Sequence, residues 1–264
     1  MKFIKYLFAL VLFINLTNSQ ENYRELPNNS WGFGERLSFE ISYGFITAAE
    51  AFFTISPSPV VINGRETYEI NFETNSRPSF DVIYKVRDNY KSYIDTRGIF
   101  PWKFEQHIRE PKFTKDFEVN FLPDSAKVKT KENNGAVKEY QAPAYVQDII
   151  SAFYYVRTLD LTKYRDGETI SVPAFNDDKQ FSLAVKIIGR ETVDVAAGEF
   201  KTIIVQPMLS EGFTNKTSDI FVYLSDDERK IPVKVKMKIV IGALVGELTE
   251  YSGLRGPLDS KIGD

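Results

Sequence analysis

The stretch IPVKVKMKIVI, residues 231–241, shows the clearest period of two in the sequence. Its odd positions are all apolar, and lysines occupy positions 234, 236 and 238. Successive side chains of a β-strand point to opposite faces, so this alternation predicts a strand with one buried and one solvated face. The lysines form a basic row that either faces water or meets anionic lipid or glycan at a surface.

The same alternation recurs along most of the chain between Glu35 and Tyr251. Asn63-Gly64 and Asn134-Gly135 are dipeptides that favour tight hairpins, so neighbouring strands should pair antiparallel. The sequence therefore predicts an all-β fold of about fourteen strands. We expect a large, mostly antiparallel twisted sheet curled into a barrel or near-barrel. The segments 43–50 and 241–247 resemble each other, and pairing of these first and last hairpins would close the barrel.

One segment, Gln147 to Leu161, has apolar residues at helical spacing instead. Pro143 precedes it, and Asp148 lies where a carboxylate suits the positive end of a helix dipole. We predict one helix here, packed on the sheet.

The N-terminus predicts export. Residues 1–19 contain two lysines near the start, then an uncharged apolar run, and small residues at the expected cleavage site. This pattern is typical of a signal peptide. The run is too short to span a bilayer, so we expect no transmembrane segment in the mature chain and a location in the periplasm or outside the cell. The expected organisation is a signal peptide (1–19), an N-terminal extension (20–33), a single β-rich domain (34–252) and a flexible C-terminal tail (253–264).

Composition excludes several kinds of chemistry. The chain contains no Cys and a single His, so thiol catalysis, iron–sulfur clusters and His- or Cys-rich zinc sites are excluded, and we expect no cofactor and no metal. The formal charge of −3 becomes −5 once the two signal-peptide lysines are removed. Basic and acidic residues are interspersed, which argues against a nucleic-acid partner.

Four blocks in a fixed order resemble the DUF3108 family of exported bacterial proteins. They are GERLSF (34–39), DIISAFYYVR (148–157), GRETV with AGEFKT (189–202), and LSDD with RKIPV (224–233). Tyr223 stands where the family usually has a tryptophan. The resemblance implies an envelope protein with a large antiparallel β fold. The family's function is uncharacterised, so it implies no catalytic residues.

A polar spot on an apolar wall is the first candidate site. A turn at Glu110-Pro111 would set Phe104 beside Phe117 and Gln106 beside Lys115, on inward faces that are otherwise apolar. Such a spot could grip the anionic head group of a ligand, or Lys115 could extend to the rim. The candidate ligand-binding residues are Gln106, Lys115, Trp102, Phe104 and Phe117.

Glu50 and Glu247 form the second candidate site, because both lie in strands that are otherwise small or apolar. If the terminal hairpins pair, the two carboxylates could act as acid and nucleophile in glycan cleavage, or both could point outward. His107 falls on the outward face of its strand, which opposes a Ser-His-Asp triad.

The leading interpretation is a non-enzymatic envelope protein with a binding or assembly role toward an apolar or amphipathic ligand, either lipid or lipid-linked glycan. The alternatives are a hydrolase acting on cell-envelope glycan and a purely structural module that binds an envelope protein. An integral outer-membrane barrel is disfavoured because the outward faces carry charges that are costly in lipid.

Overall fold

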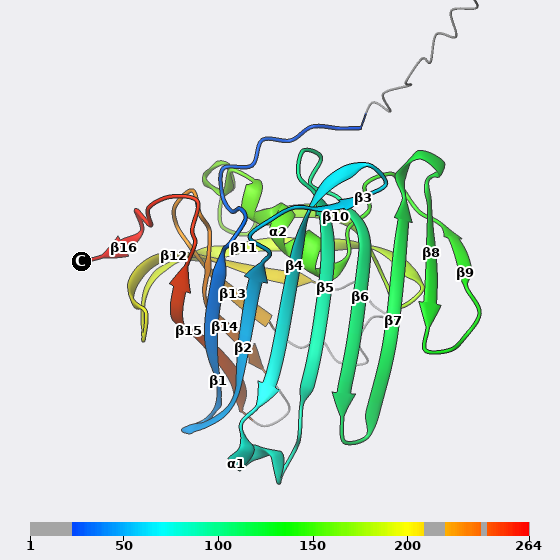
Figure 1. Cartoon of the computed structure of the whole chain (residues 1–264). Coiled ribbons are helices and arrows are strands. Elements are labelled where there is room, and N and C mark those ends of the chain that lie inside the picture. Colours follow the sequence, from blue (N-terminus) through cyan, green and yellow to red (C-terminus); the bar gives the residue numbers. More distant parts are fainter. Residues whose placement is uncertain (1–22, 209–219, 239–241, 264) are drawn as a thin grey trace, which may run out of the picture.

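The strands of this protein form one large antiparallel sheet that curves around α2 (Figure 1). The computed structural model describes residues 23–208, 220–238 and 242–263, so the predicted signal peptide lies outside the described residues. The α-helices are α1 (Pro78–Asp81) and α2 (Ile149–Thr158), and two single-turn 3-10 helices are η1 (Pro123–Ser125) and η2 (Leu161–Lys163). The strands are β1 (Arg36–Tyr43), β2 (Ile46–Ile55), β3 (Val60–Ile62), β4 (Arg65–Ser76), β5 (Arg87–Asp95), β6 (Pro101–Glu110), β7 (Phe113–Leu122), β8 (Lys127–Glu132), β9 (Lys138–Gln141), β10 (Thr169–Asn176), β11 (Lys179–Val195), β12 (Gly198–Met208), β13 (Ile220–Ser225), β14 (Pro232–Lys238), β15 (Ala243–Ser252) and β16 (Lys261–Ile262).

Strand β14 confirms the predicted alternation over its described residues, which end at Lys238. Val233 is fully buried, whereas Lys234 remains partly exposed and forms an ion pair with Glu247 of β15 at 2.7 Å. The apolar side chains of this strand therefore face the interior, and its lysines face solvent.

The sheet is open, so the prediction of barrel closure by the terminal hairpins is wrong. Its hydrogen-bonded order is β10-β11-β12-β13-β14-β15-β1-β2-β4-β5-β6-β7-β8-β9, with β3 and β16 as short additions. The first and last long strands do pair, with Arg36 opposite Ser252 and Tyr43 opposite Leu244. This pairing lies in the middle of the sheet, however. The two edges are β9 and β10, which are consecutive along the chain and are connected through α2.

No continuous ladder of backbone hydrogen bonds joins the two edge strands among the described residues. Side-chain hydrogen bonds and one short β-bridge connect this region instead. Gln147, just before α2, forms a parallel bridge with Ala174 of β10 and covers part of that edge. At the β10–β11 turn, Asp178 accepts hydrogen bonds from Thr130 of β8 at 2.7 Å and from Lys138 of β9 at 2.8 Å. We call this region between β9 and β10 the seam. Because an open edge invites pairing with other chains, covering it protects the sheet.

Helix α2 is confirmed, although it is shorter than the predicted 147–161. Asp148 is its N-cap: the carboxylate accepts hydrogen bonds from the backbone N–H groups of Ile150 and Ser151, both at 2.8 Å. The Ser151 hydroxyl accepts from the Asp148 N–H in return, which completes a capping box. The sequence prediction of a single helix missed α1, a single turn that begins at Pro78. Strand β5 accordingly begins only at Arg87.

Three clusters of buried apolar side chains make up the interior. Phe153 and Tyr155 of α2 pack against the first and second clusters, and Phe53 and Phe72 pack against the first and third. These shared side chains make the apolar interior continuous, with α2 at its centre.

Both segments that flank the sheet are packed against it. Trp31, in the predicted N-terminal extension, is fully buried and donates from Nε1 to the carbonyl of Tyr154 at 3.0 Å. The segment 253–264 was expected to be a flexible tail, but β16 within it pairs with β12. Ser260 is buried, and its hydroxyl donates to Asp227 at 2.6 Å. These contacts correct the expectation for the described part of the tail.

Candidate functional site

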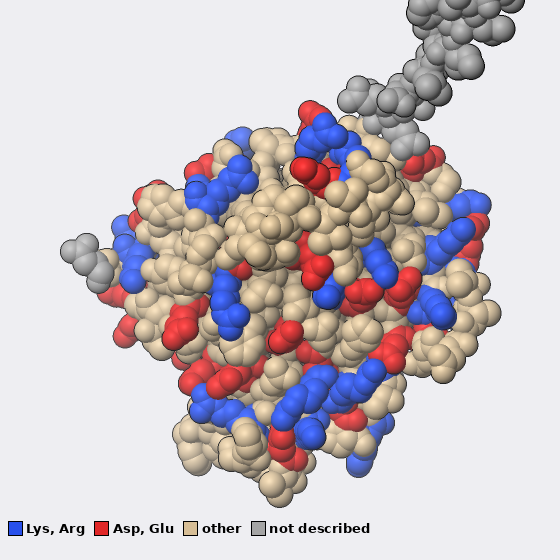
Figure 2. Space-filling model, viewed as in Figure 1, with Lys and Arg blue, Asp and Glu red and all other residues tan. Residues whose placement is uncertain are grey.

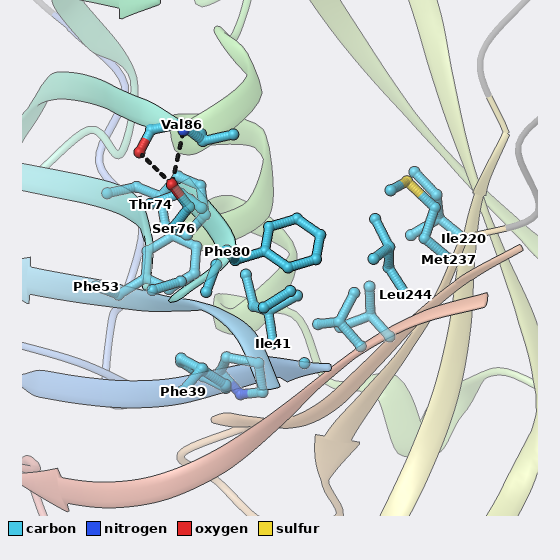
Figure 3. Close-up of a pocket in the computed structure, with 18 of the residues that line it drawn as sticks. Phe39, Ile41, Phe53, Thr74, Ser76, Phe80, Val86, Ile220, Met237 and Leu244 are labelled. Atoms are coloured by element: carbon cyan, nitrogen blue, oxygen red, sulfur yellow. Dashed lines mark hydrogen bonds between the residues drawn. The ribbon is translucent and has the colours of Figure 1, made fainter. Parts of the chain in front are cut away.

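An apolar cavity of about 550 Å³ lies on the concave side of the sheet (Figure 3). Strands β1, β2 and β4 form one wall, and β13, β14 and β15 form the facing wall. The segment around α1 contributes at one end, and Phe153 of α2 contributes from the interior. The lining consists of Phe39, Ile41, Ala48, Ala49, Ala51, Phe53, Phe72, Thr74, Ser76, Phe80, Tyr84, Val86, Glu110, Phe153, Ile220, Val222, Pro232, Val235, Met237, Leu244 and Gly246.

The alternation of the strands explains why the lining is apolar. On each wall strand, every second residue points inward, and these inward positions are nearly all hydrocarbon. Small residues at some of them leave space that larger side chains would fill: Ala49 and Ala51 on β2, and Gly246 on β15. The cavity therefore results from small side chains placed opposite each other on a curved sheet.

Aromatic side chains close the inner part of the cavity. The ring of Phe53 stacks on that of Phe72 at 4.4 Å between centroids and on that of Phe153 at 5.5 Å. Because Phe153 belongs to α2, the helix fixes the depth of the cavity. The capping box fixes the start of α2 and therefore helps to place Phe153 at the inner end of the cavity.

Polar groups are concentrated where the α1 segment borders the cavity. The Tyr84 hydroxyl donates to the Glu110 carboxylate at 2.7 Å, and this hydrogen bond raises the pKa of Tyr84. The Ser76 hydroxyl accepts from the Val86 N–H at 2.8 Å (Figure 3). Phe80 projects between the two walls. The site thus combines a hydrocarbon interior with a small polar group at one end, which is typical of pockets for amphipathic ligands.

The residues predicted to bind a ligand lie outside this cavity. Gln106 and Lys115 are both buried, as the inward pattern indicated. Lys115, however, forms an ion pair with Asp177 and lies 4.5 Å from the centre of the Phe117 ring. Phe104 and Phe117 belong to the first apolar cluster. Trp102 donates from Nε1 to Asp95 at 3.1 Å.

The predicted register of the β6–β7 hairpin is wrong. Gln106 lies opposite Phe117, and Lys115 lies opposite Ile108. The reason is the turn: Glu110 pairs with Phe113, so the loop residues are Pro111 and Lys112 and the pairing shifts by two residues. The carboxamide oxygen of Gln106 is buried without a hydrogen-bond partner among the described residues.

Glu50 and Glu247 lie on either side of Glu40 of β1, which pairs with both of them. Their backbones are therefore two strand spacings apart, about 10 Å, with Glu40 between them, so the two residues are not direct neighbours in the sheet. Arg77 contacts Glu50 at 3.0 Å, and Lys234 contacts Glu247 at 2.7 Å. Arg77 also contacts Glu40, so Glu50 shares its cation with Glu40, while Lys234 neutralises Glu247. Neither Glu50 nor Glu247 lines the cavity.

His107 lies on the outward face, as predicted, with nearly half of its side chain exposed. Its Nδ1 lies 2.7 Å from the Asp116 carboxylate, which Arg109 also contacts at 2.6 Å. Within residues 23–208, 220–238 and 242–263, the acidic and histidine side chains form no cluster able to hold a metal ion. The helices in the same ranges are all too short or too polar to cross a bilayer.

The sequence signals of this cavity are indirect. The two similar segments noted at 43–50 and 241–247 do flank β1, and they supply Ala48, Ala49, Leu244 and Gly246 to the lining. The contribution of the α1 segment had no such signal in the sequence.

The fold and the cavity define an open, barrel-like β protein with an apolar interior site. The chain belongs to the DUF3108 family of proteins of unknown function, whose model matches residues 38–249. No curated protein matches the sequence.

Several solved structures align with most of this chain. A β-barrel-like DUF1849 protein from Brucella abortus aligns with a TM-score of 0.57 at 10% identity, over 83% of this chain and 97% of that one. A Bacteroides fragilis protein, described as exported and YmcC-like in fold, aligns with a TM-score of 0.38 at 10% identity, over 87% and 99% of the two chains. A Chlamydia trachomatis hypothetical protein aligns with a TM-score of 0.36 at 9% identity, over 89% and 94%. The likeness to the Brucella protein concerns the fold alone.

Proposed function

We propose that this protein is an exported, non-enzymatic binding protein of the cell envelope that holds the hydrocarbon chain of a lipid or a lipid-linked glycan in its cavity. The observation that carries the proposal is the cavity itself: about 550 Å³, with hydrocarbon on both walls. Small-molecule sites commonly measure about 300–1,000 Å³.

The chemistry of the lining selects the ligand class. Phe39 and Ile41 on one wall and Met237 and Leu244 on the other offer contact without hydrogen bonds. Each methylene group removed from water contributes about 0.8 kcal/mol, so an acyl or isoprenoid chain gains affinity over most of its length. A free sugar or peptide would leave its polar groups unpaired against these walls.

The polar end of the cavity suits the head group of such a ligand. Tyr84 and Ser76 supply hydroxyl groups there, while Glu110 disfavours an anion at the position where it accepts from Tyr84. We therefore assign the head group to this end and the chain to the interior beside Phe153.

The N-terminal sequence supports an envelope location. Residues 1–19 have the pattern of a signal peptide, and the apolar run is too short to serve as a membrane span. After cleavage, the protein would meet envelope lipids in the periplasm or outside the cell.

Native mass spectrometry of the protein purified from its own envelope tests this function. We expect a retained mass that matches a lipid or lipid-linked glycan and that organic extraction removes. A clean apo mass, together with failure of the extracted protein to bind a fluorescent fatty acid, would contradict the proposal.

A matched pair of variants assigns the binding to the cavity. Gly246→Leu introduces a side chain into the cavity, where a Cβ would meet only ordinary contact with Ile41 at 3.8 Å. Val245→Leu alters the neighbouring residue, which does not line the cavity. We expect Gly246→Leu to lose most fatty-acid binding and Val245→Leu to keep it. Equal binding by the two variants would place the ligand elsewhere.

A further inference from the structure

The end of the molecule that carries α1 exposes an unusual amount of hydrocarbon. Phe45 at the β1–β2 turn is 99% exposed, and Val82 and Ile83, just after α1, are 90% and 72% exposed. These are the three most exposed large apolar residues among those the structure describes. We call them the apolar tip. Figure 1 shows the β1–β2 turn, α1 and the β6–β7 turn at this same end, away from α2.

Several contacts hold these turns together. The Arg77 backbone N–H donates to the carbonyl of Ala48 at 2.9 Å, which fixes the start of the α1 segment to β2. The Tyr84 hydroxyl then joins the end of that segment to Glu110 at the β6–β7 turn. The apolar tip is therefore presented on an anchored scaffold.

The tip is accompanied by basic side chains. Lys85 lies two residues after Ile83, and Lys112 occupies the β6–β7 turn beside Phe113, which is 52% exposed. Both lysines are exposed, and neither forms an ion pair with any described residue. The acidic side chains at this end are already engaged, Asp81 with Arg87 and Glu110 with Tyr84. In Figure 2, Lys and Arg, with Asp and Glu among them, cross the lower part of the molecule above lobes made of other residues.

The same segment faces the cavity on its other side. Phe80 and Tyr84 line the cavity, whereas Val82 and Ile83 between them are exposed to solvent. A short segment thus separates the apolar interior from an apolar exterior. Whatever the tip touches is adjacent to the end of the cavity that we assign to the head group.

We propose that the apolar tip docks onto the surface of a membrane that contains anionic lipids. Phe45, Val82 and Ile83 enter the boundary between head groups and acyl chains, and Lys85 and Lys112 meet the anionic head groups. Aromatic and aliphatic side chains flanked by lysine are the combination that interfacial binding uses. Docking in this orientation brings the polar end of the cavity to the bilayer, so this inference extends the proposed lipid-binding function.

Vesicle flotation with the full mature chain tests the docking. We expect binding to vesicles of phosphatidylcholine with phosphatidylglycerol, and weaker binding to phosphatidylcholine alone. Phe45→Ser with Ile83→Ser should reduce binding at least ten-fold. Lys85→Glu with Lys112→Glu should reduce it at least ten-fold on anionic vesicles only, since each lysine near such a surface contributes about a five-fold factor at physiological salt.

Val61→Ser is the matched control. Val61 is 66% exposed but lies on β3, at the end opposite the tip. We expect this variant to bind vesicles like the unaltered protein. Equal loss in Val61→Ser and the tip variants, or no vesicle binding by the unaltered protein, would overturn the proposal and favour a protein partner at this surface.

Uptake of a soluble fluorescent fatty acid separates this inference from the proposed function. The tip variants should bind the probe normally, and Gly246→Leu should still float with vesicles. If the probe binds but the vesicles do not, only the docking proposal fails. If vesicles bind but Gly246→Leu leaves probe binding unchanged, only the cavity assignment fails.

Discussion

Arg157 and Glu35 form a bidentate ion pair in which both side chains are completely buried. The guanidinium donates to the two carboxylate oxygens at 2.7 and 2.8 Å. Arg157 lies at the end of α2 and Glu35 just before β1, so the pair joins the helix to the middle of the sheet. The Arg157 backbone carbonyl also accepts from Ser30 at 2.7 Å. The N-terminal extension, α2 and β1 therefore meet at one charged contact.

Glu35→Gln should destabilise the protein strongly. The substitution leaves the Arg157 guanidinium buried without its counter-charge, and breaking one side of a buried pair costs about 3–5 kcal/mol. The double variant Glu35→Leu with Arg157→Met, which removes both charges, should lose less. Urea unfolding of the three proteins checks this, and a single variant as stable as the unaltered protein would contradict the argument.

Asp148 should make stability depend on pH. Burial raises the pKa of this carboxyl from 3.8 to about 6, although hydrogen bonds from Ser151, Ser92 and Ile150 act in the opposite direction. The native state therefore holds the proton more tightly than the unfolded chain. The stability that protonation contributes is fully present below about pH 3.8 and is lost as the pH rises through about 6.

Asp148→Asn isolates this effect, because asparagine caps a helix about as well as aspartate but does not titrate. From about pH 4 to about pH 7.5, the variant should gain roughly 2–3 kcal/mol in unfolding free energy relative to the unaltered protein. Urea unfolding at both pH values measures the difference, in which the other titrating groups largely cancel. A difference that does not change with pH would show that the carboxyl is not buried as described.

Ligand affinity should rise with chain length and then level off. Each added methylene that enters the cavity contributes about 0.8 kcal/mol, a factor of roughly four in affinity. Once the space between Phe153 and Tyr84 is filled, further methylenes remain in water and add little. Competition of a homologous series of fatty acids against a fluorescent one measures this. In Gly246→Leu the plateau should come at a shorter chain, and the same plateau in both proteins would contradict the cavity assignment.

The seam should depend on the ion pair between Lys115 and Asp177. Lys115 is buried, so Asp177→Ala removes its charged partner and should cost about 1–2 kcal/mol, a value limited by the half-exposed side chain of Asp177. Lys115→Met with Asp177→Ala should recover most of this loss, because the chain of Met suits the apolar surroundings of Phe117. Thermal unfolding of the single and double variants provides the measurement.

Local sequence patterns predicted the strands and α2, but they did not predict the cavity. The alternation in 231–241 predicted β14, and Asp148 with its apolar neighbours predicted α2, because each pattern is complete within a few residues. The burial of Gln106 and Lys115 also followed from alternation. The alternation did not identify the partner of Lys115. Asp177 lies in a turn far along the chain, and only the curvature of the sheet brings it next to Lys115.

The cavity depends on distant residues in the same way. Ala49 and Gly246 leave space only because β2 and β15 both pair with β1. A small residue within a strand is uninformative until its neighbours across the sheet are known. The open edges were missed for a related reason. Pairing of β1 with β15 was anticipated. Closure of the sheet into a barrel, however, depends on whether β9 pairs with β10, and the side chains of these two strands do not indicate whether they do.

The central position of β1 has a consequence for synthesis of the chain. Arg36 pairs with Ser252, so the contact that unites the two halves of the sheet spans most of the sequence. Such distant contacts form slowly, and the half built from β1 to β9 must wait for β15 with one flank of β1 uncovered. An uncovered strand can pair with another copy. The nascent protein is therefore most vulnerable to aggregation before β15 has been synthesised, and pairing of β15 with β1 ends that exposure.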